Sequence, residues 1–279
     1  MAAPPAHQPL APRHRARQNG GMDWINEDRV ALRRAKSLLE SPGLAVRIAN
    51  TVGAPIEKLF KALPEGAGNA IHAATTKSLD GALRVATSLM DEERRPAVDR
   101  LHSVAVAATG AVGGAFGLAA LAAELPVSTA IMLRSIADIA RSEGHPIKSR
   151  LVQLSCLEVF ALGAPTGADD AAEVGYFAVR AALARAVSEA AEHLAVRGLA
   201  AESAPALVRL ISKIASRFGI PVTEKVLAQS VPLIGAAGGA MINVLFIRHF
   251  QDLARGHFIV LRLEGTYGPD AVKSAYAAL

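Results

Sequence analysis

Hydrophobic residues recur every three or four positions along most of this chain, and glycine, proline or charged clusters separate the stretches in which they do so. That spacing is typical of amphipathic helices, because side chains three and four positions apart share one helical face. No stretch alternates β-branched and polar residues with a period of two, so the sequence predicts no strands. We therefore expect an all-α protein of about nine or ten helices.

The helix boundaries follow from the proline and glycine positions. Proline lacks a backbone donor and crowds the preceding turn, so we expect helix breaks at Glu124–Pro126 and at Ile220–Pro221. A short helix follows the second break. The other predicted helices are Glu27–Glu40, Leu44–Leu63 (interrupted near Gly53–Pro55), Asn69–Met90, Val98–Ala123, Val127–Ser142, Arg150–Leu162, Asp169–Arg197, Pro205–Phe218, Leu233–Glu264 and Pro269–Ala278.

Two of these helices carry a predicted buried stripe. The stripe of the first comprises Tyr176, Val179, Leu183, Val187, Ala190 and Leu194, and that of the second comprises Leu207, Leu210, Ile211, Ile214 and Phe218. On the second helix, Arg209, Lys213 and Arg217 form a basic stripe away from the apolar one. Such a stripe suits either solvent or an anionic membrane surface.

Two apolar, glycine-bearing stretches are predicted to form the centre of the fold. Ser103–Ala123 has 21 residues without a charge and contains GAVGGA, which GAAGGA echoes near the C-terminus. Small residues at such spacing let two helix backbones approach closely. We expect the two helices to pack against each other through Gly110, Gly113, Gly114, Gly117, Gly235, Gly238 and Gly239.

The same stretches raise the question of a membrane. About 20 apolar residues span a bilayer, so Ser103–Ala123 is long enough, but its glycines weaken it as a spanning helix. The second stretch, Ser230–Ile247, contains Pro232 and Asn243. We interpret both as helices buried within the protein, with shallow or conditional membrane insertion as the alternative.

Composition and charge narrow the classes of function. The formal net charge is +5, and Arg13, Arg15 and Arg17 supply three of these charges. The remaining residues are near neutral, so we expect no nucleic-acid binding. Residues 1–21 are rich in proline and lack acids, which predicts a disordered tail before one helical domain over residues 22–279. Cys156 lies in an apolar run and is interpreted as a buried hydrophobe.

Several separated blocks resemble the bacterial EcsC protein family. They are LHSVAVAATGAVGGAFGLAALAAELPVSTAIMLRSIADIARSEG, CLEVFALG, DDAAEVGYFAVRAAL and VPLIGAAGGAMINVLFIRHFQDLARGHFIVLRLE. The resemblance covers about Ala45 to Tyr267. The family takes its name from a gene that neighbours an ABC transporter, so the resemblance implies a helical domain with membrane or transport association. It supplies no catalytic residues.

A repeated Arg-Asp-Arg pattern is the first candidate site. The pattern occurs in RSIADIAR as Arg134, Asp138 and Arg141, and in RHFQDLAR as Arg248, Asp252 and Arg255. In each copy the three side chains share one helical face. We expect an ion-pair network between the two glycine-bearing helices. A site for a phosphate or carboxylate ligand is the alternative, because arginine forks bind such groups.

An acidic cluster is the second candidate site. Acids in a first helical turn commonly stabilise the helix dipole, and we adopt that interpretation for the acids after GAPTGA. The alternative is a divalent metal site, because His249 and Asp252 are three positions apart on a helix. Its candidate ligands are Asp169, Asp170, Glu173, His249, Asp252 and Glu158. No phosphate-binding loop, dinucleotide fingerprint or serine-hydrolase elbow occurs, so no cofactor is expected otherwise.

These patterns leave three hypotheses for function. The first is a non-enzymatic, membrane-peripheral or transport-accessory protein, whose partners are an anionic membrane surface or ABC transporter components. It places the protein in the cytoplasm, at the inner face of the cell membrane. The second is a metal-assisted hydrolase that uses the acidic cluster, and the third is a soluble helical scaffold. The sequence leaves the oligomeric state and the presence of catalysis open.

Overall fold

A computed structural model describes residues 24–52, 66–88, 118–164, 172–197, 204–229 and 235–279 of the chain, and these residues form helices and no strand. The all-α prediction is confirmed. The helices are α1 (Asn26–Leu39), α2 (Leu44–Val52), α4 (Ala67–Ser88), α6 (Leu118–Ser142), α7 (Arg150–Leu162), α8 (Ala172–Arg197), α9 (Pro205–Gln229), α10 (Gly235–Tyr267) and α11 (Pro269–Ala277).

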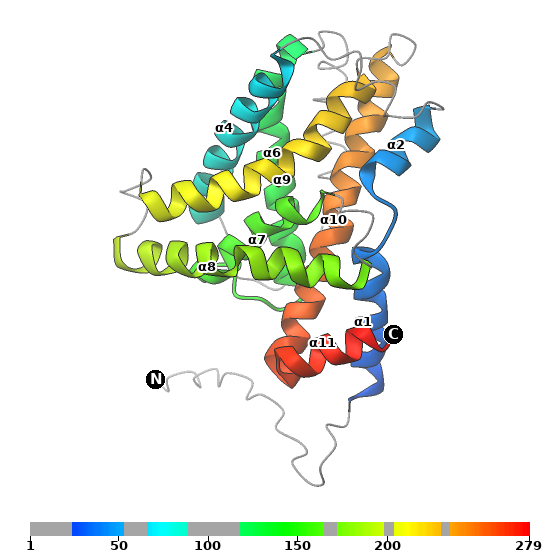
Figure 1. Cartoon of the computed structure of the whole chain (residues 1–279), viewed down its shortest axis with the longest axis vertical. Coiled ribbons are helices and arrows are strands. Elements are labelled where there is room, and N and C mark those ends of the chain that lie inside the picture. Colours follow the sequence, from blue (N-terminus) through cyan, green and yellow to red (C-terminus); the bar gives the residue numbers. More distant parts are fainter. Residues whose placement is uncertain (1–23, 53–65, 89–117, 165–171, 198–203, 230–234) are drawn as a thin grey trace, which may run out of the picture.

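The helix α10 is the central element of the arrangement. Its 33 residues run along the long axis of the molecule, and α1, α2, α6, α7, α9 and α11 all pack against it. The helices α4 and α6 pair beside α9, while α8 packs on α7 and α9 (Figure 1). The C-terminal glycine-bearing helix is therefore central, as the sequence predicts. Most of its proposed counterpart, Ser103–Ala123, lies outside the described residues.

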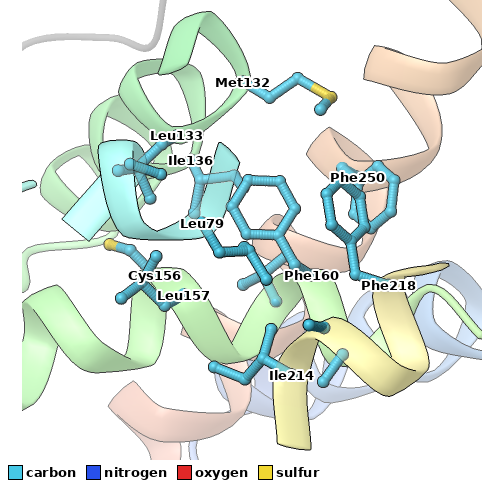
Figure 2. Close-up of a cluster of buried hydrophobic side chains, with 14 of the residues drawn as sticks. Leu79, Met132, Leu133, Ile136, Cys156, Leu157, Phe160, Ile214, Phe218 and Phe250 are labelled. Carbon is cyan, nitrogen blue, oxygen red and sulfur yellow. The ribbon is translucent and has the colours of Figure 1, made fainter. Parts of the chain in front are cut away.

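A cluster of phenylalanines joins three helices at the centre of the core. Phe160 of α7, Phe218 of α9 and Phe250 of α10 contact one another. Their ring centroids are 4.7 Å apart for Phe160–Phe218, 5.5 Å for Phe160–Phe250 and 5.4 Å for Phe218–Phe250. Figure 2 shows Leu79 of α4 and residues of α6 beside this cluster. Edge-to-face aromatic pairs add about 0.5–1.5 kcal/mol to the burial of their area. Three phenylalanines of the chain therefore pack together where α7, α9 and α10 meet.

Both predicted buried stripes are confirmed. Every member of the α8 stripe and of the α9 stripe is buried, and so is Cys156. The helix α7 has the predicted bounds, and α1, α4 and α11 differ from prediction by a few residues at their ends. Helix periodicity located these elements because each stripe is a local pattern.

The two predicted proline breaks are wrong. Pro126 lies inside α6 and Pro221 inside α9, and both helices continue through them. A proline inside a helix costs about 3 kcal/mol, so packing must offset the lost hydrogen bond. Leu125 and Ser128 are buried on either side of Pro126, and Pro221 itself is buried. Burial along α6 and α9 therefore keeps both helices continuous through their prolines. A rule based on the proline and its sequence neighbours alone cannot predict this.

Candidate functional site

The repeated Arg-Asp-Arg residues lie on α6 and α10, which pack against each other. Asp138 accepts a hydrogen bond from Arg141 at 2.6 Å within α6. Asp252 accepts one from Arg47 of α2 at 2.9 Å, so the α10 copy connects α10 to α2. Arg134 and Arg248 are exposed, and Arg255 is half-buried. Pairing between the two copies, or an anionic ligand between them, stays a prediction.

The predicted metal ligands fall partly outside the described residues. Asp169 and Asp170 lie in the segment 165–171, and the side chain of Glu173 is likewise not described. Among the side chains that are described, no group of three or more His, Cys, Asp or Glu residues could hold a metal ion. Asp252 is bound to Arg47, and the Nε2 atom of His249 lies 3.3 Å from the carbonyl oxygen of Gly163.

The structure describes only some of the glycines that were predicted to pack the two central helices together. Gly110, Gly113, Gly114 and Gly117 lie outside the described residues. On α10, Gly235 is the first residue, Gly238 is half-buried and Gly239 is buried. Contact between the two glycine faces therefore remains a prediction.

Buried and half-buried polar side chains connect α8 to α10. The hydroxyl of Tyr176 lies 2.9 Å from Nδ1 of His257, and both side chains are buried. One turn further along α8, Arg180 donates to both carboxylate oxygens of Glu264, at 2.7 and 2.8 Å. Burial raises the pKa of Tyr176 and lowers that of His257 well below its usual value, so both are neutral near pH 7.

An open cleft of about 420 Å³ adjoins these polar side chains. Its polar lining residues are Ser155, Glu158, Arg180, Ser188, Glu264, Asp270 and Lys273, from α7, α8, α10 and α11. Glu158 is 7% exposed, and this burial raises its pKa to about 7, although the charge of Arg180 and a hydrogen bond from Ser155 act against the rise. A carboxyl group with this pKa can exchange a proton near neutrality, which suits a general acid or base.

The predicted basic stripe of α9 is occupied by contacts with its neighbours. Arg209 donates to Glu189 of α8 at 2.9 Å, and Arg217 donates to the carbonyl oxygen of Ala161 at 2.7 Å. Lys213 donates to the carbonyl oxygen of Ala182. These contacts connect α9 to α7 and α8. Arg209 and Lys213 are nevertheless exposed, and Arg217 is half-buried.

The outer face of α1 is a second basic surface, and all three of its arginines are exposed. Leu32 and Ala35 are buried against α10, while Arg29, Arg33 and Arg34 point outward. Val30 lies among these arginines and is 57% exposed. We call Arg29, Val30, Arg33 and Arg34 the α1 outer face.

Residues 28–263 match the model of the EcsC protein family. The chain belongs to this family. The resemblance found in the sequence blocks is confirmed. The match begins within α1 and ends within α10, so α11 is the described helix that lies outside it. No curated protein and no solved structure matches the chain significantly. Among the described residues, no helix of this EcsC protein combines the length and the hydropathy needed to cross a membrane.

Sequence reasoning missed most of the buried polar groups. Tyr176 and His257 are 81 positions apart, and Arg180 and Glu264 are 84 apart, so no local spacing connects them. The signal that was available is the isolation of Glu158, the one acidic residue of the largely apolar helix α7. A charged residue in such a stretch commonly has a specific partner.

Proposed function

We propose that this EcsC protein is a peripheral membrane protein. Its α1 outer face binds the anionic surface of a membrane, and the protein assists transport there. The observation that supports this most directly is the exposure of Arg29, Arg33 and Arg34 around an exposed valine. Each basic residue near an anionic surface contributes about 1 kcal/mol. An exposed valine among them can enter the boundary between headgroups and acyl chains.

The charges around α1 favour this surface over the α9 stripe. Glu27 is exposed beside the arginines, but the carboxylate of Asp28 is held by Arg262 at 3.1 Å and by the hydroxyl of Tyr267 at 2.8 Å. The tail that precedes α1 adds Arg13, Arg15 and Arg17 to the same end of the sequence. The arginine charge of α1 is therefore only partly compensated.

The transport part of the proposal comes from the family. Its name derives from a gene beside an ABC transporter, so the partners that we propose at the membrane are transporter components. We propose that the protein acts at the cytoplasmic face of the cell membrane. The scaffold hypothesis differs from the membrane proposal in one respect, because a soluble scaffold would not bind lipid.

Co-sedimentation with vesicles tests the membrane proposal. The protein should bind phosphatidylglycerol vesicles at low salt and stay in solution with phosphatidylcholine vesicles. The triple variant Arg29→Gln/Arg33→Gln/Arg34→Gln should bind about 100-fold more weakly, since three charges contribute about 3 kcal/mol.

A matched variant controls for total charge. Arg185→Gln/Arg209→Gln/Lys213→Gln removes three positive charges from the surface that α8 and α9 share. We expect it to change binding by less than about threefold, because that surface is not the one in contact. Equal loss in both triple variants, or a wild-type protein that ignores anionic vesicles, would contradict the proposal.

The cleft beside Glu158 supports hydrolysis as a second candidate function. The raised pKa of Glu158 makes this residue an acid or base near neutral pH. The metal site predicted from the sequence rests partly on residues that the structure does not describe. Elemental analysis of the purified protein, with and without Glu158→Gln, tests the metal requirement. A stoichiometric divalent metal that the variant loses would favour the hydrolase.

A further inference from the structure

The cleft beside Glu158 contains a carboxyl group that no cation neutralises. Glu158 is 7% exposed, and its exposed part lies on the cleft, of which it is a lining residue. The positive charge that acts on it is that of Arg180, but this guanidinium donates to both carboxylate oxygens of Glu264. Among the described side chains, no cation forms an ion pair with Glu158. A nearly buried carboxylate is costly without such a partner.

The ionisable residues that line the cleft have an excess of negative charge. They are Glu158, Arg180, Glu264, Asp270 and Lys273, which come from α7, α8, α10 and α11. Arg180 and Glu264 neutralise each other, and on α11 Lys273 balances Asp270. When Glu158 is ionised, one negative charge therefore remains uncompensated. This balance favours a cation in the cleft over an anion.

Ser155 and the apolar lining define the kind of cation that fits. The hydroxyl of Ser155 donates to Glu158, and Ser155 also lines the cleft, so its oxygen can accept a hydrogen bond from a ligand. Phe177, Val187 and Leu261 supply apolar surface. The described residues include no group of three side chains that could hold a metal ion. The lining therefore suits an organic cation with at least two N–H donors and a hydrocarbon body.

We propose that this cleft binds a small organic cation that consists of a primary ammonium group on a hydrocarbon body. The ammonium group donates one N–H to the carboxylate of Glu158 and another to the hydroxyl oxygen of Ser155. The hydrocarbon body lies against Phe177 and Leu261. The inference goes beyond both candidate functions, because binding requires neither a membrane nor hydrolysis, and no lining residue belongs to the α1 outer face.

Binding of this cation should be linked to the release of a proton. Burial raises the pKa of Glu158 to about 7, so about half of the free protein carries a proton on this carboxyl group at pH 7. The ammonium group pairs with the ionised form, so binding lowers the pKa of Glu158 and expels the proton. The affinity should therefore rise about 10-fold per pH unit below pH 7 and level off above it.

The test titrates benzylammonium chloride into the full chain and follows binding by calorimetry from pH 5.5 to pH 8. The affinity should rise about 30-fold over this range, and binding at pH 6 should release close to one proton, measured in two buffers of different ionisation enthalpy. Benzyltrimethylammonium has the same charge and no N–H donor, so it should bind at least 10-fold more weakly at pH 8. Glu158→Gln should weaken benzylammonium binding at pH 8 by about 10- to 100-fold and abolish the proton release.

Asp270→Asn is the matched control, because it removes one negative charge from the same cleft at an exposed position. It should weaken binding by less than about threefold and leave the proton release intact, since solvent screens an exposed charge. Circular dichroism should show that both variants fold. The proposal is overturned if benzylammonium fails to saturate, if both ammonium compounds bind equally, or if the affinity is independent of pH. Equal losses in the two variants would also overturn it, because the negative charge of the whole cleft would then attract the cation without a contact to Glu158.

Discussion

Gly256 of α10 lies directly against Ala35 of α1. A Cβ atom at position 256 would be 3.0 Å from the carbonyl oxygen of Ala35 and 2.7 Å from Cγ of Leu39. The bare glycine backbone therefore lets α1 pack closely on α10. This contact fixes the orientation of α1, with Ala35 inward and the α1 outer face toward solvent.

Substitution of Gly256 by alanine is expected to loosen this contact. The added methyl group must displace the Leu39 side chain and crowds the carbonyl oxygen of Ala35. Overpacking of this kind costs about 1–3 kcal/mol. Gly265 is the control on the same helix, because a Cβ there meets nothing within 4 Å. Gly265→Ala should stabilise the protein by about 0.5–1 kcal/mol through helix propensity. Urea unfolding of both variants measures the difference; a Gly256→Ala protein as stable as Gly265→Ala would refute the close contact.

Glu158 should make stability fall as pH rises toward neutrality. Burial raises its folded-state pKa from 4.5 to about 7, so the folded protein retains a proton that the unfolded chain has released. The stabilising contribution is complete below about pH 4.5 and is lost as pH rises to about 7. Glu158→Gln imitates the protonated carboxyl and should match the wild type at pH 4, but exceed it by on the order of 3 kcal/mol at pH 8.

The difference in unfolding free energy between the wild type and Glu158→Gln, followed across pH, separates the contribution of Glu158 from that of other titrating groups. His249 has a lowered pKa, so its own contribution has the opposite sign and is common to both proteins. Thermal and urea unfolding at intervals from pH 4 to pH 8 provides the measurement. A difference that stays constant over this range would show that the carboxyl titrates normally.

Lys225 and Glu124 form a buried ion pair between α9 and α6. Their Nζ and Oε1 atoms are 2.7 Å apart, and Asn243 of α10 donates to the same oxygen at 3.0 Å. Lys225 is fully buried, and this burial lowers its pKa, although Glu124 opposes the change. Lys225→Met alone leaves a buried carboxylate without its cation and should cost about 3–5 kcal/mol.

The double variant Glu124→Gln/Lys225→Met should recover much of that loss. The glutamine oxygen still accepts from Asn243, and no buried charge remains. A double-mutant cycle by urea unfolding should give a coupling energy of about 2 kcal/mol or more. Additive effects of the two substitutions would mean that the pair does not act as a unit.

The sequence predicted those parts of the fold that local patterns determine. The stripes of α8 and α9 were found because their members are three or four positions apart. The breaks expected at Pro126 and Pro221 were wrong, because packing with distant helices holds α6 and α9 continuous. A rule about one residue and its neighbours contains no information about that packing.

The candidate site was less predictable than the fold. The spacing of His249 and Asp252 suggested a shared metal as the alternative interpretation, and the structure shows that Asp252 binds Arg47, 205 positions away in sequence. The Nε2 atom of His249 lies 3.3 Å from the carbonyl oxygen of Gly163, 86 positions away in sequence. Pairings of this range arise only from the tertiary arrangement, so one sequence without homologues does not reveal them.

The α1 outer face should meet the membrane at Val30. Burial raises the pKa of the Cys156 thiol far above its usual value, so this native cysteine should not react with labels at pH 7.5. Val30→Cys therefore offers one reactive thiol for an environment-sensitive fluorophore. Its emission should shift to the blue with anionic vesicles, because the label moves from water to the boundary between headgroups and acyl chains. Val208→Cys on α9 is the matched control, since Val208 is 54% exposed and Val30 57%. The same shift from both positions, or none from position 30, would mean that α1 does not form the contact.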